Sequence, residues 1–394
     1  MKIEFLDLGK QPLANGFLYK NEIDNEFFYN LSIGIDETTK LVSLMDFVDA
    51  PKMFNENYHY RASMSNTMRL HFEKFSKTIP SYFEKEKIKI LEIGSNDGVF
   101  LKLNPPADTI AVEPCKNFAK ETTDMGYFTY NEFWSEELSK EIDKSFGKQD
   151  VIYAANCICH IPDLKSTFSA VENLLSDDGM FVFEDPSLLY MVNNNSYDQI
   201  YDEHAHIFSV IALSNMLSDV GLEIFKVENL SVHGGSNRIY VKKKNSNSFK
   251  IEDSVSYNIS LEKILGLDTV EFFIGWAEKI KKSKIELVNL LEKIKKNNKK
   301  TICYGASSKS TTVFNYCGIN SDLISYVIDT TPEKQGKLTP GTHIEIVSPE
   351  IGLNKEVDFA YLGAWNFVDE ICKKEAEFLK LGKFITHVPT VKIV

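Results

Sequence analysis

One short segment, residues 90–98, constrains the fold of this chain more than any other. Four strand-like residues, Ile90 to Ile93, run into a turn with the sequence Gly-Ser-Asn-Asp-Gly. Glycine adopts a positive φ without a Cβ clash and lets the backbone pass close to a ligand. Strand-like and helix-like segments alternate after this turn. The pattern predicts a mostly parallel sheet with helices on both faces and a ligand site at the carboxyl ends of its strands.

The segments around this turn predict the strands of the sheet and several helices. Apolar runs predict strands at 88–93, 109–112, 151–155 and 180–183, and two antiparallel edge strands at 224–227 and 238–241. A helix is expected at 164–175, closed by a polar turn at 176–179. A further helix is expected from four apolar residues at helical spacing, Met68, Leu70, Phe72 and Phe75.

A length of 394 residues exceeds one compact domain, and the patterns divide the chain into three parts. Residues 1–70 alternate in short stretches broken by glycine and aspartate, which predicts a small β-rich module. Residues 71–250 form the Rossmann-like domain, and residues 251–394 combine a helical linker with a second, smaller α/β domain. One side of the linker, in its lysine-rich part, carries Ile280, Leu287, Leu291 and Ile294. This spacing predicts a helix with one buried face.

The glycine turn also distinguishes between two classes of cofactor. Dinucleotide sites use Gly-x-Gly-x-x-Gly, whereas here Asn96 stands where the middle glycine would let a pyrophosphate approach. S-adenosylmethionine (SAM) has no phosphate, and a turn with polar side chains can hold its amino-acid end. Glu113 ends the next strand, where a carboxylate accepts hydrogen bonds from ribose hydroxyls. We therefore predict SAM, bound by Glu92, Gly94, Asn96, Asp97, Gly98, Glu113, Pro114, Asn156 and His160.

Cysteine usage and charge limit the other ligands. Cys157, Cys159 and His160 form the one close metal-like group, but Cys-x-Cys-His supplies no second pair for a tetrahedral site, so we expect reduced thiols and no metal. The net charge of −12 argues against a nucleic-acid partner. No apolar run reaches about 18 residues, so no membrane span is expected. The chain also starts without a signal-peptide pattern, which predicts a cytoplasmic protein. The oligomeric state stays open, a monomer included.

With these motifs placed, the sequence resembles the family of sugar C-methyltransferases that make branched deoxysugars on a nucleotide diphosphate carrier. The resemblance covers nearly the whole chain and is greatest to enzymes that methylate C-3 of a 3-amino-4-keto-deoxysugar. It rests on segments 7–15, 53–60, 92–98, 183–186, 198–204, 232–235, 304–309, 329–335 and 364–366. That family opens with a zinc module. Here Asp36 and Thr39 stand in place of one cysteine pair, and no first pair is present, so the module is expected to rely on apolar contacts or to be loosely ordered.

Methylation of a carbon next to a ketone needs a base that removes the α-proton and a group that stabilises the enolate. Residues 201–204 offer a phenol, two carboxyls and an imidazole, and histidine has the best pKa for a base near neutral pH. The resemblance implies that His204 is this base, and the sequence leaves His206 open as an alternative. The resemblance implies that Tyr201 and Glu203 also line the sugar site. It further implies that a tyrosine of the N-terminal part, Tyr58 or its neighbour Tyr60, closes over the sugar.

The C-terminal domain is expected to hold the nucleotide-diphosphate end of the substrate. Lys309 follows a glycine turn near a helix start, which suits a phosphate contact. The full set of predicted substrate-binding residues is His233, Gly234, Gly235, Lys309, Trp365 and Asn366. Three other interpretations stay open: an O- or N-methyltransferase on a similar sugar, an inactive scaffold of the same fold, and a nicotinamide oxidoreductase.

Overall fold

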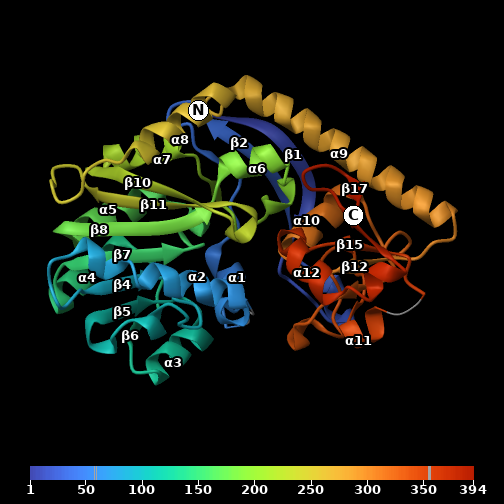
Figure 1. Ribbon diagram of the computed structural model, residues 1–394, viewed down its shortest axis with the longest axis horizontal. Coiled ribbons are helices and arrows are strands. Elements are labelled where there is room, and N and C mark those ends of the chain that lie inside the picture. The colour runs from blue at the N-terminus through green and yellow to red at the C-terminus, as the bar shows by residue number, and fades with distance from the viewer. Residues whose placement is uncertain (57, 59, 354–355) are drawn as a thin grey trace.

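The computed structural model describes residues 1–56, 58, 60–353 and 356–394, which form three sheets and their helices (Figure 1). Two positions of the segment 53–60, Asn57 and His59, lie outside the described residues. Within the described ranges, no helix is both long enough and apolar enough to cross a membrane.

A seven-stranded sheet confirms the predicted α/β fold. Its strand order is β10-β11-β8-β7-β4-β5-β6. The strands are β4 (Ile90–Ile93), β5 (Thr109–Val112), β6 (Phe128–Tyr130), β7 (Gln149–Ala155), β8 (Leu175–Pro186), β10 (Leu222–Leu230) and β11 (Ser236–Lys243). Strands β4 to β8 pair in parallel, and β10 and β11 run antiparallel at the edge, as predicted.

Six helices belong to this sheet domain and its surroundings. They are α2 (Asn66–Ser76), α3 (Lys116–Asp124), α4 (Glu136–Phe146), α5 (Leu164–Leu174), α6 (Leu188–Asn194) and α7 (Val210–Asp219). On the sheet, the carboxyl ends of β4, β5 and β7 lie at one edge because these strands are parallel neighbours. This edge faces the second lobe of the molecule (Figure 1).

Two details of the sheet domain differ from the prediction. The polar residues 176–179 lie inside β8, which begins at Leu175, but they are left out of its pairing with β7, because Leu175 pairs with Gln149 and Met180 with Val151. The register against β7 shifts between Gln149 and Val151, and this irregularity accommodates the polar run within the strand. In α2, the apolar Leu70 is 57% exposed, while Met68, Phe72 and Phe75 are buried as expected.

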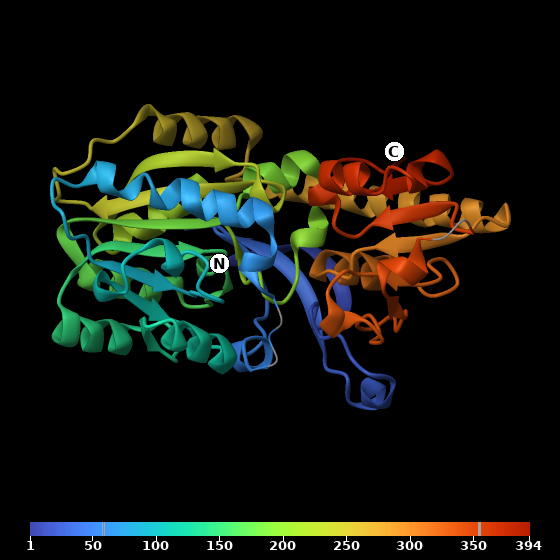
Figure 2. The same cartoon turned by 60° about the horizontal axis from the view of Figure 1, so that its bottom comes forward.

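The N-terminal module is a four-stranded antiparallel sheet of order β1-β2-β3-β9. Its strands are β1 (Lys2–Pro12), β2 (Phe28–Asp36), β3 (Val42–Leu44) and β9 (His206–Ile207), and a short helix, α1 (Ala50–Met53), follows. Strands β1 and β2 are longer than the short stretches that the sequence predicts. Since β9 belongs to the sheet domain by sequence, the module is tied to that domain by backbone pairing. Its strands pass between the two lobes (Figure 2).

A hydrogen-bonded turn stands at Asp36 and Thr39, where the resemblance to the sugar C-methyltransferases implies the position of a cysteine pair. One carboxylate oxygen of Asp36 accepts bonds from the backbone N–H groups of Thr38 and Thr39, both at 2.9 Å, and from the Thr39 hydroxyl at 3.2 Å. The other oxygen lies 3.4 Å from the amino group of Met1. These contacts organise the β2–β3 turn. Polar contacts therefore hold the module together with the apolar contacts that the sequence predicts.

The C-terminal part is a second, smaller sheet domain reached through two helices. The helices α8 (Asp253–Leu265) and α9 (Val270–Lys296) precede strands β12 (Thr301–Tyr304), β13 (Val327–Ile328), β14 (Ile346–Val347), β15 (Phe359–Leu362), β16 (Lys383–Thr386) and β17 (Lys392–Ile393). Helices α10 (Ser308–Cys317), α11 (Pro349–Gly352) and α12 (Val368–Lys374) lie between these strands in sequence. Helix α9 runs along both lobes, and its predicted apolar side is buried (Figure 1).

The turn at Asp36 generates a prediction about stability. Asp36→Ala removes the acceptor of three local hydrogen bonds and should lower the free energy of unfolding by about 1 kcal/mol in urea titrations. The exposed neighbour Glu37 is the matched control, and Glu37→Ala should change stability by less than about 0.5 kcal/mol. Treatment with EDTA should leave the unfolding midpoint unchanged, whereas a fall on chelation would show that a metal holds the module.

Candidate active site

The glycine turn after β4 is shaped by its neighbours. Gly94 has a φ of 71°, and a Cβ there would meet the Cys157 sulfur at 2.7 Å. Gly98 has a φ of 73°. At the end of β5, Glu113 accepts hydrogen bonds from the backbone N–H groups of Asn96 at 2.7 Å and Cys115 at 2.8 Å. The carboxylate of Glu113 is therefore fixed beside the turn, as the sequence predicts for a ribose ligand.

Buried polar atoms without partners show what this turn can hold. The Oε2 atom of Glu92 and the hydroxyl of Ser95 are buried and have no hydrogen-bond partner among the described residues. Burial, and next the carboxylates of Glu113 and Asp97, raise the pKa of Glu92. A cation bound at this turn would favour the charged form of Glu92, and SAM carries a sulfonium and an ammonium group. The residues present therefore fit SAM.

The side chains of Asn96 and Asp97 have partners within the chain. The amide of Asn96 accepts a bond from the Ala62 N–H and donates one to the Tyr60 carbonyl, both at 3.0 Å. Asp97 accepts bonds from the backbone N–H and the hydroxyl of Ser63. The sequence predicts that both side chains hold the methionine end of SAM. In the structure they hold residues 60–63 against the glycine turn, because their polar atoms are used there.

Two further predicted cofactor residues shape the carboxyl ends of the strands. Asn156, after β7, has a φ of 50°, a left-handed conformation that asparagine tolerates better than most residues. Its N–H donates to the Glu184 carbonyl at 2.6 Å, so the chain turns sharply towards the short 3-10 helix Ile158–His160. The carbonyl of Pro114 accepts a bond from the Asn131 amide at 2.9 Å. Both residues therefore set backbone shape at the predicted cofactor edge.

His204 has a defined hydrogen-bonding state. Its Nδ1 lies 2.7 Å from the carbonyl of Gln199, so Nδ1 carries the proton. Its Nε2 then accepts a bond from the hydroxyl of Tyr201 at 2.8 Å. Burial, followed by the charges of His160 and Lys309, lowers the pKa of His204 well below its usual range. The imidazole is neutral at physiological pH, and its one lone pair faces a phenol.

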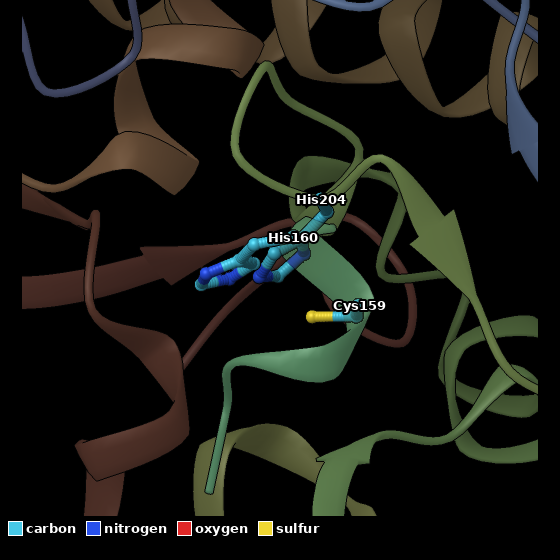
Figure 3. Close-up of side chains that lie close together, drawn as sticks. All are labelled: Cys159, His160 and His204. Atoms are coloured by element: carbon cyan, nitrogen blue, oxygen red, sulfur yellow. The ribbon is translucent and has the colours of Figure 1, made fainter. Parts of the chain in front are cut away.

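His204 also brings a third candidate metal ligand to Cys159 and His160. The ligand atoms of the three residues lie within 4.8 Å of one another, and the sequence missed this grouping because His204 is distant along the chain. Figure 3 shows the two imidazoles lying roughly parallel; their centroids are 5.5 Å apart and their planes differ by 19°. Nitrogen lone pairs lie in the ring plane, so stacked rings cannot direct both at one ion. The geometry does not fit a metal site.

Two adjacent carboxyls lie beside this histidine. The Asn15 amide donates to Glu203 Oε1 at 2.6 Å, and the Tyr58 hydroxyl donates to Glu203 Oε2 at 3.2 Å. The Ala14 N–H donates to Asp202 at 2.9 Å. Burial, with the neighbouring Glu203 next, raises the pKa of Asp202 to about 8. Tyr58 is thus the tyrosine that contacts this acidic pair. Sequence reasoning missed Asn15 as a contributor, although it lies in the family-like segment 7–15.

Two lysines of the C-terminal domain face the acidic pair. Lys309 is in the first turn of α10, and Lys334 ends a 3-10 helix, with its ammonium donating to the Ala306 carbonyl at 2.7 Å. Burial lowers the pKa of each lysine, and nearby carboxylates, Glu203 among them, oppose this shift. Sequence reasoning identified Lys309 but missed Lys334, whose only signal is its place in the segment 329–335.

Two of the remaining predicted substrate residues, Gly234 and Trp365, form a contact between the two domains. A Cβ at Gly234 would come within 2.6 Å of the Trp365 ring, and one at Gly235 within 2.5 Å of Tyr190. The Trp365 indole N–H donates to a carboxylate oxygen of Asp198 at 2.5 Å. Since its donor and part of its ring are used inside the protein, Trp365 is a joint between domains rather than a free platform for a ligand.

Two predicted residues beside this joint show less defined roles. Asn366 follows Trp365 in the short helix Trp365–Phe367 and is half-buried. His233 has a φ of 53°, and burial lowers its pKa to about 4. Substrate contact for both stays a prediction.

Family models match three consecutive parts of the chain. Residues 1–54 match a model described as "Putative zinc binding domain", residues 60–227 a "Methyltransferase domain", and residues 231–389 a "C-methyltransferase C-terminal domain". Together these matches make the chain similar to C-methyltransferases over nearly its whole length. It is a SAM-dependent methyltransferase, although none of its six cysteines lies in the part that matches the zinc model.

A curated relative and several solved structures are similar to this chain. C-methyltransferase NovU of Streptomyces niveus is 28% identical over 397 residues, which cover 100% of this chain and 94% of the relative. A SAM-dependent methyltransferase from Clostridium acetobutylicum is 16% identical, with a TM-score of 0.35, and covers 46% of this chain and 93% of that chain. Magnesium protoporphyrin IX methyltransferase from Synechocystis, solved with SAM, is 10% identical, with a TM-score of 0.34, over 44% of this chain and 79% of that chain.

The geometry at the end of β5 leads to a prediction about cofactor affinity. Glu113→Gln keeps the size of the side chain but removes its charge, so it should weaken S-adenosylhomocysteine binding about 10- to 100-fold in titration calorimetry. Glu137, exposed on α4, supplies the control, and Glu137→Gln should bind as the wild type does. Equal affinity of the Glu113 variant and the wild type would exclude a ribose contact for this carboxylate.

Proposed function

We propose that the protein transfers a methyl group to carbon C-3 of a nucleotide diphosphate-linked 4-keto-deoxysugar. The observation that carries this proposal is the juxtaposition of a neutral imidazole, the acidic pair Asp202 and Glu203, and two lysines beside the cofactor edge of the sheet domain. The imidazole can remove a proton from a carbon acid, and the lysines can bind the negative charge of a diphosphate. No other cluster among the described residues combines these groups with the glycine turn.

The proposed base is His204 acting together with Tyr201. The Nε2 atom of His204 is the acceptor, because Nδ1 donates to the Gln199 carbonyl. Its low pKa keeps it unprotonated at neutral pH. Since the Tyr201 hydroxyl occupies that lone pair, the proton of C-3 passes to the imidazole through the phenol or after the phenol turns aside. This refines the simpler proposal in which His204 contacts the substrate alone.

The remaining groups bind and orient the sugar nucleotide. Glu203, oriented by Tyr58, is the anionic partner for a hydroxyl or amino group of the sugar. Lys309 and Lys334 supply positive charge for the diphosphate in a chain whose net charge is −12. The C-terminal domain, residues 251–394, thus holds the nucleotide end, and the sheet domain, residues 71–250, holds the cofactor. When bound, SAM supplies the electrophilic methyl group for the enolate carbon.

The principal alternative to this proposal is methyl transfer to an oxygen or a nitrogen atom of the sugar. An O- or N-methyltransferase would use the same glycine turn but would need no base for a carbon acid. The relative NovU is named a C-methyltransferase, which supports carbon as the acceptor atom. Mass spectrometry of a panel of nucleoside diphosphate 4-keto-6-deoxyhexoses, incubated with SAM and enzyme, would identify the substrate.

The base can be tested without methyl transfer. In D₂O with the keto-sugar and S-adenosylhomocysteine, the wild type should exchange the proton at C-3, as observed by NMR. His204→Asn should slow this exchange at least about 100-fold. His206 is the matched control because its Nε2 faces the carbonyls of Ile161 and Pro162, so His206→Asn should retain exchange. Absence of exchange in the wild type would exclude an enolate mechanism.

The lysines can be tested through the substrate's KM. Lys309→Ala should raise the KM for the sugar nucleotide about tenfold or more, because a charge-assisted contact to the diphosphate is lost. Affinity for S-adenosylhomocysteine should stay unchanged. Lys282→Ala is the control, since that side chain is 77% exposed on α9. An unchanged KM in the Lys309 variant would place the diphosphate elsewhere.

A further inference from the structure

The N-terminal module reaches the acidic pair through two consecutive residues just after β1. The Ala14 N–H binds Asp202, and the Asn15 amide binds Glu203 at 2.6 Å. Ala14 is buried, and Asn15 is half-buried. The Asn15 carbonyl accepts a bond from the Phe17 N–H at 2.9 Å, which fixes the loop locally. Asn15 therefore does not reach Glu203 from a free loop.

This loop is also anchored to the C-terminal domain on its other side. Leu18 forms a backbone bridge with Leu338. Farther along, the Glu26 carboxylate accepts a bond from the Gly341 N–H at 2.6 Å and lies 2.7 Å from His343 Nε2. The module thus contacts the acidic pair and the nucleotide-side domain at once, and the position of the Asn15 amide is determined by both.

The Glu203 carboxylate depends on few direct donors. Among the described residues, the hydrogen bonds to its two oxygens come from Asn15 and from Tyr58, one to each oxygen. The lysines act on it through their charge. An amide donor on Oε1 therefore determines which way the carboxylate faces and leaves Oε2 to the tyrosine. Loss of this donor would free the carboxylate to rotate.

We propose that Asn15 is a positioning residue for methyl transfer, and that its side-chain amide orients the Glu203 carboxylate towards Tyr58 and the sugar. The inference rests on the proposed role of Glu203 in that site. This role of Asn15 makes the N-terminal module a functional part of the proposed active site. It is separate from the zinc binding named in the family model that residues 1–54 match. Asn15 itself donates no proton in the reaction.

The isosteric variant Asn15→Asp is the sharpest test. It replaces the amide donor with a carboxyl that faces Glu203. The other charged and titratable neighbours of Glu203 are Tyr29, Tyr58, Tyr60, Cys115, Cys159, Tyr201, Asp202, Lys309 and Lys334. Above about pH 7 the two carboxylates repel each other, so kcat should fall about 10- to 100-fold. At lower pH the introduced carboxyl is protonated and again donates a hydrogen bond, so the ratio of variant to wild-type activity should recover.

The measurements separate positioning from folding. Full-length enzyme is assayed with SAM and the panel sugar that the wild type methylates fastest, and kcat and KM are measured across pH for Asn15→Asp and Asn15→Ala. Asn15→Ala should lose kcat to a similar degree but without the recovery at low pH. Asn30 is exposed on β2 of the same module, and Asn30→Asp should match the wild type at every pH. Affinity for S-adenosylhomocysteine should be equal in all variants and reports that the sheet domain is folded.

Three outcomes would overturn the inference. If both Asn15 variants keep the wild-type kcat, the amide does not position Glu203. If Asn15→Asp loses activity equally at all pH values together with S-adenosylhomocysteine affinity, its role is structural. If the wild type methylates no sugar on the panel although it binds S-adenosylhomocysteine, the proposed function is wrong, and the positioning role falls with it.

Discussion

The candidate active site depends on the burial of two adjacent carboxyls, Asp202 and Glu203, where three parts of the chain meet. A buried carboxylate is costly unless hydrogen bonds and opposite charges compensate for the lost water. Here the N-terminal module supplies hydrogen-bond donors, and the C-terminal domain supplies two lysines. Contacts from both other parts of the chain therefore compensate for the burial of the acidic pair.

The same burial determines the state of the neighbouring histidine. An imidazole in this environment stays neutral, because a positive charge would have to be desolvated beside Lys309. A neutral imidazole can accept a proton through the Tyr201 hydroxyl, or directly once that hydroxyl turns aside, which suits the proposed first step of carbon methylation. On the other side of the sheet edge, three carboxyls gather around the glycine turn. In the proposed arrangement, the carboxyls at the glycine turn face the cofactor, and the acidic pair with its two lysines faces the substrate.

Much of the sheet domain could be predicted from sequence because its signals are local. The order of apolar strands and the turn at Gly94 depend on residues that are neighbours in the chain, and the position of Glu113 at a strand end follows from them. The polar run 176–179 shows the limit of such signals, because β8 continues across it although these residues do not pair with β7. Pairing partners decide such a case, and they are distant in sequence.

The sequence by itself determined the fold class, the class of cofactor and the cluster at residues 201–204, since each is encoded in a short continuous segment. Only the tertiary structure decided which tyrosine contacts Glu203, that Trp365 joins two domains, and that Asn15 and Lys334 belong beside the acidic pair. These contacts join residues that are far apart in the chain. Their existence depends on how separate elements pack, and a linear pattern carries no information about packing between distant segments.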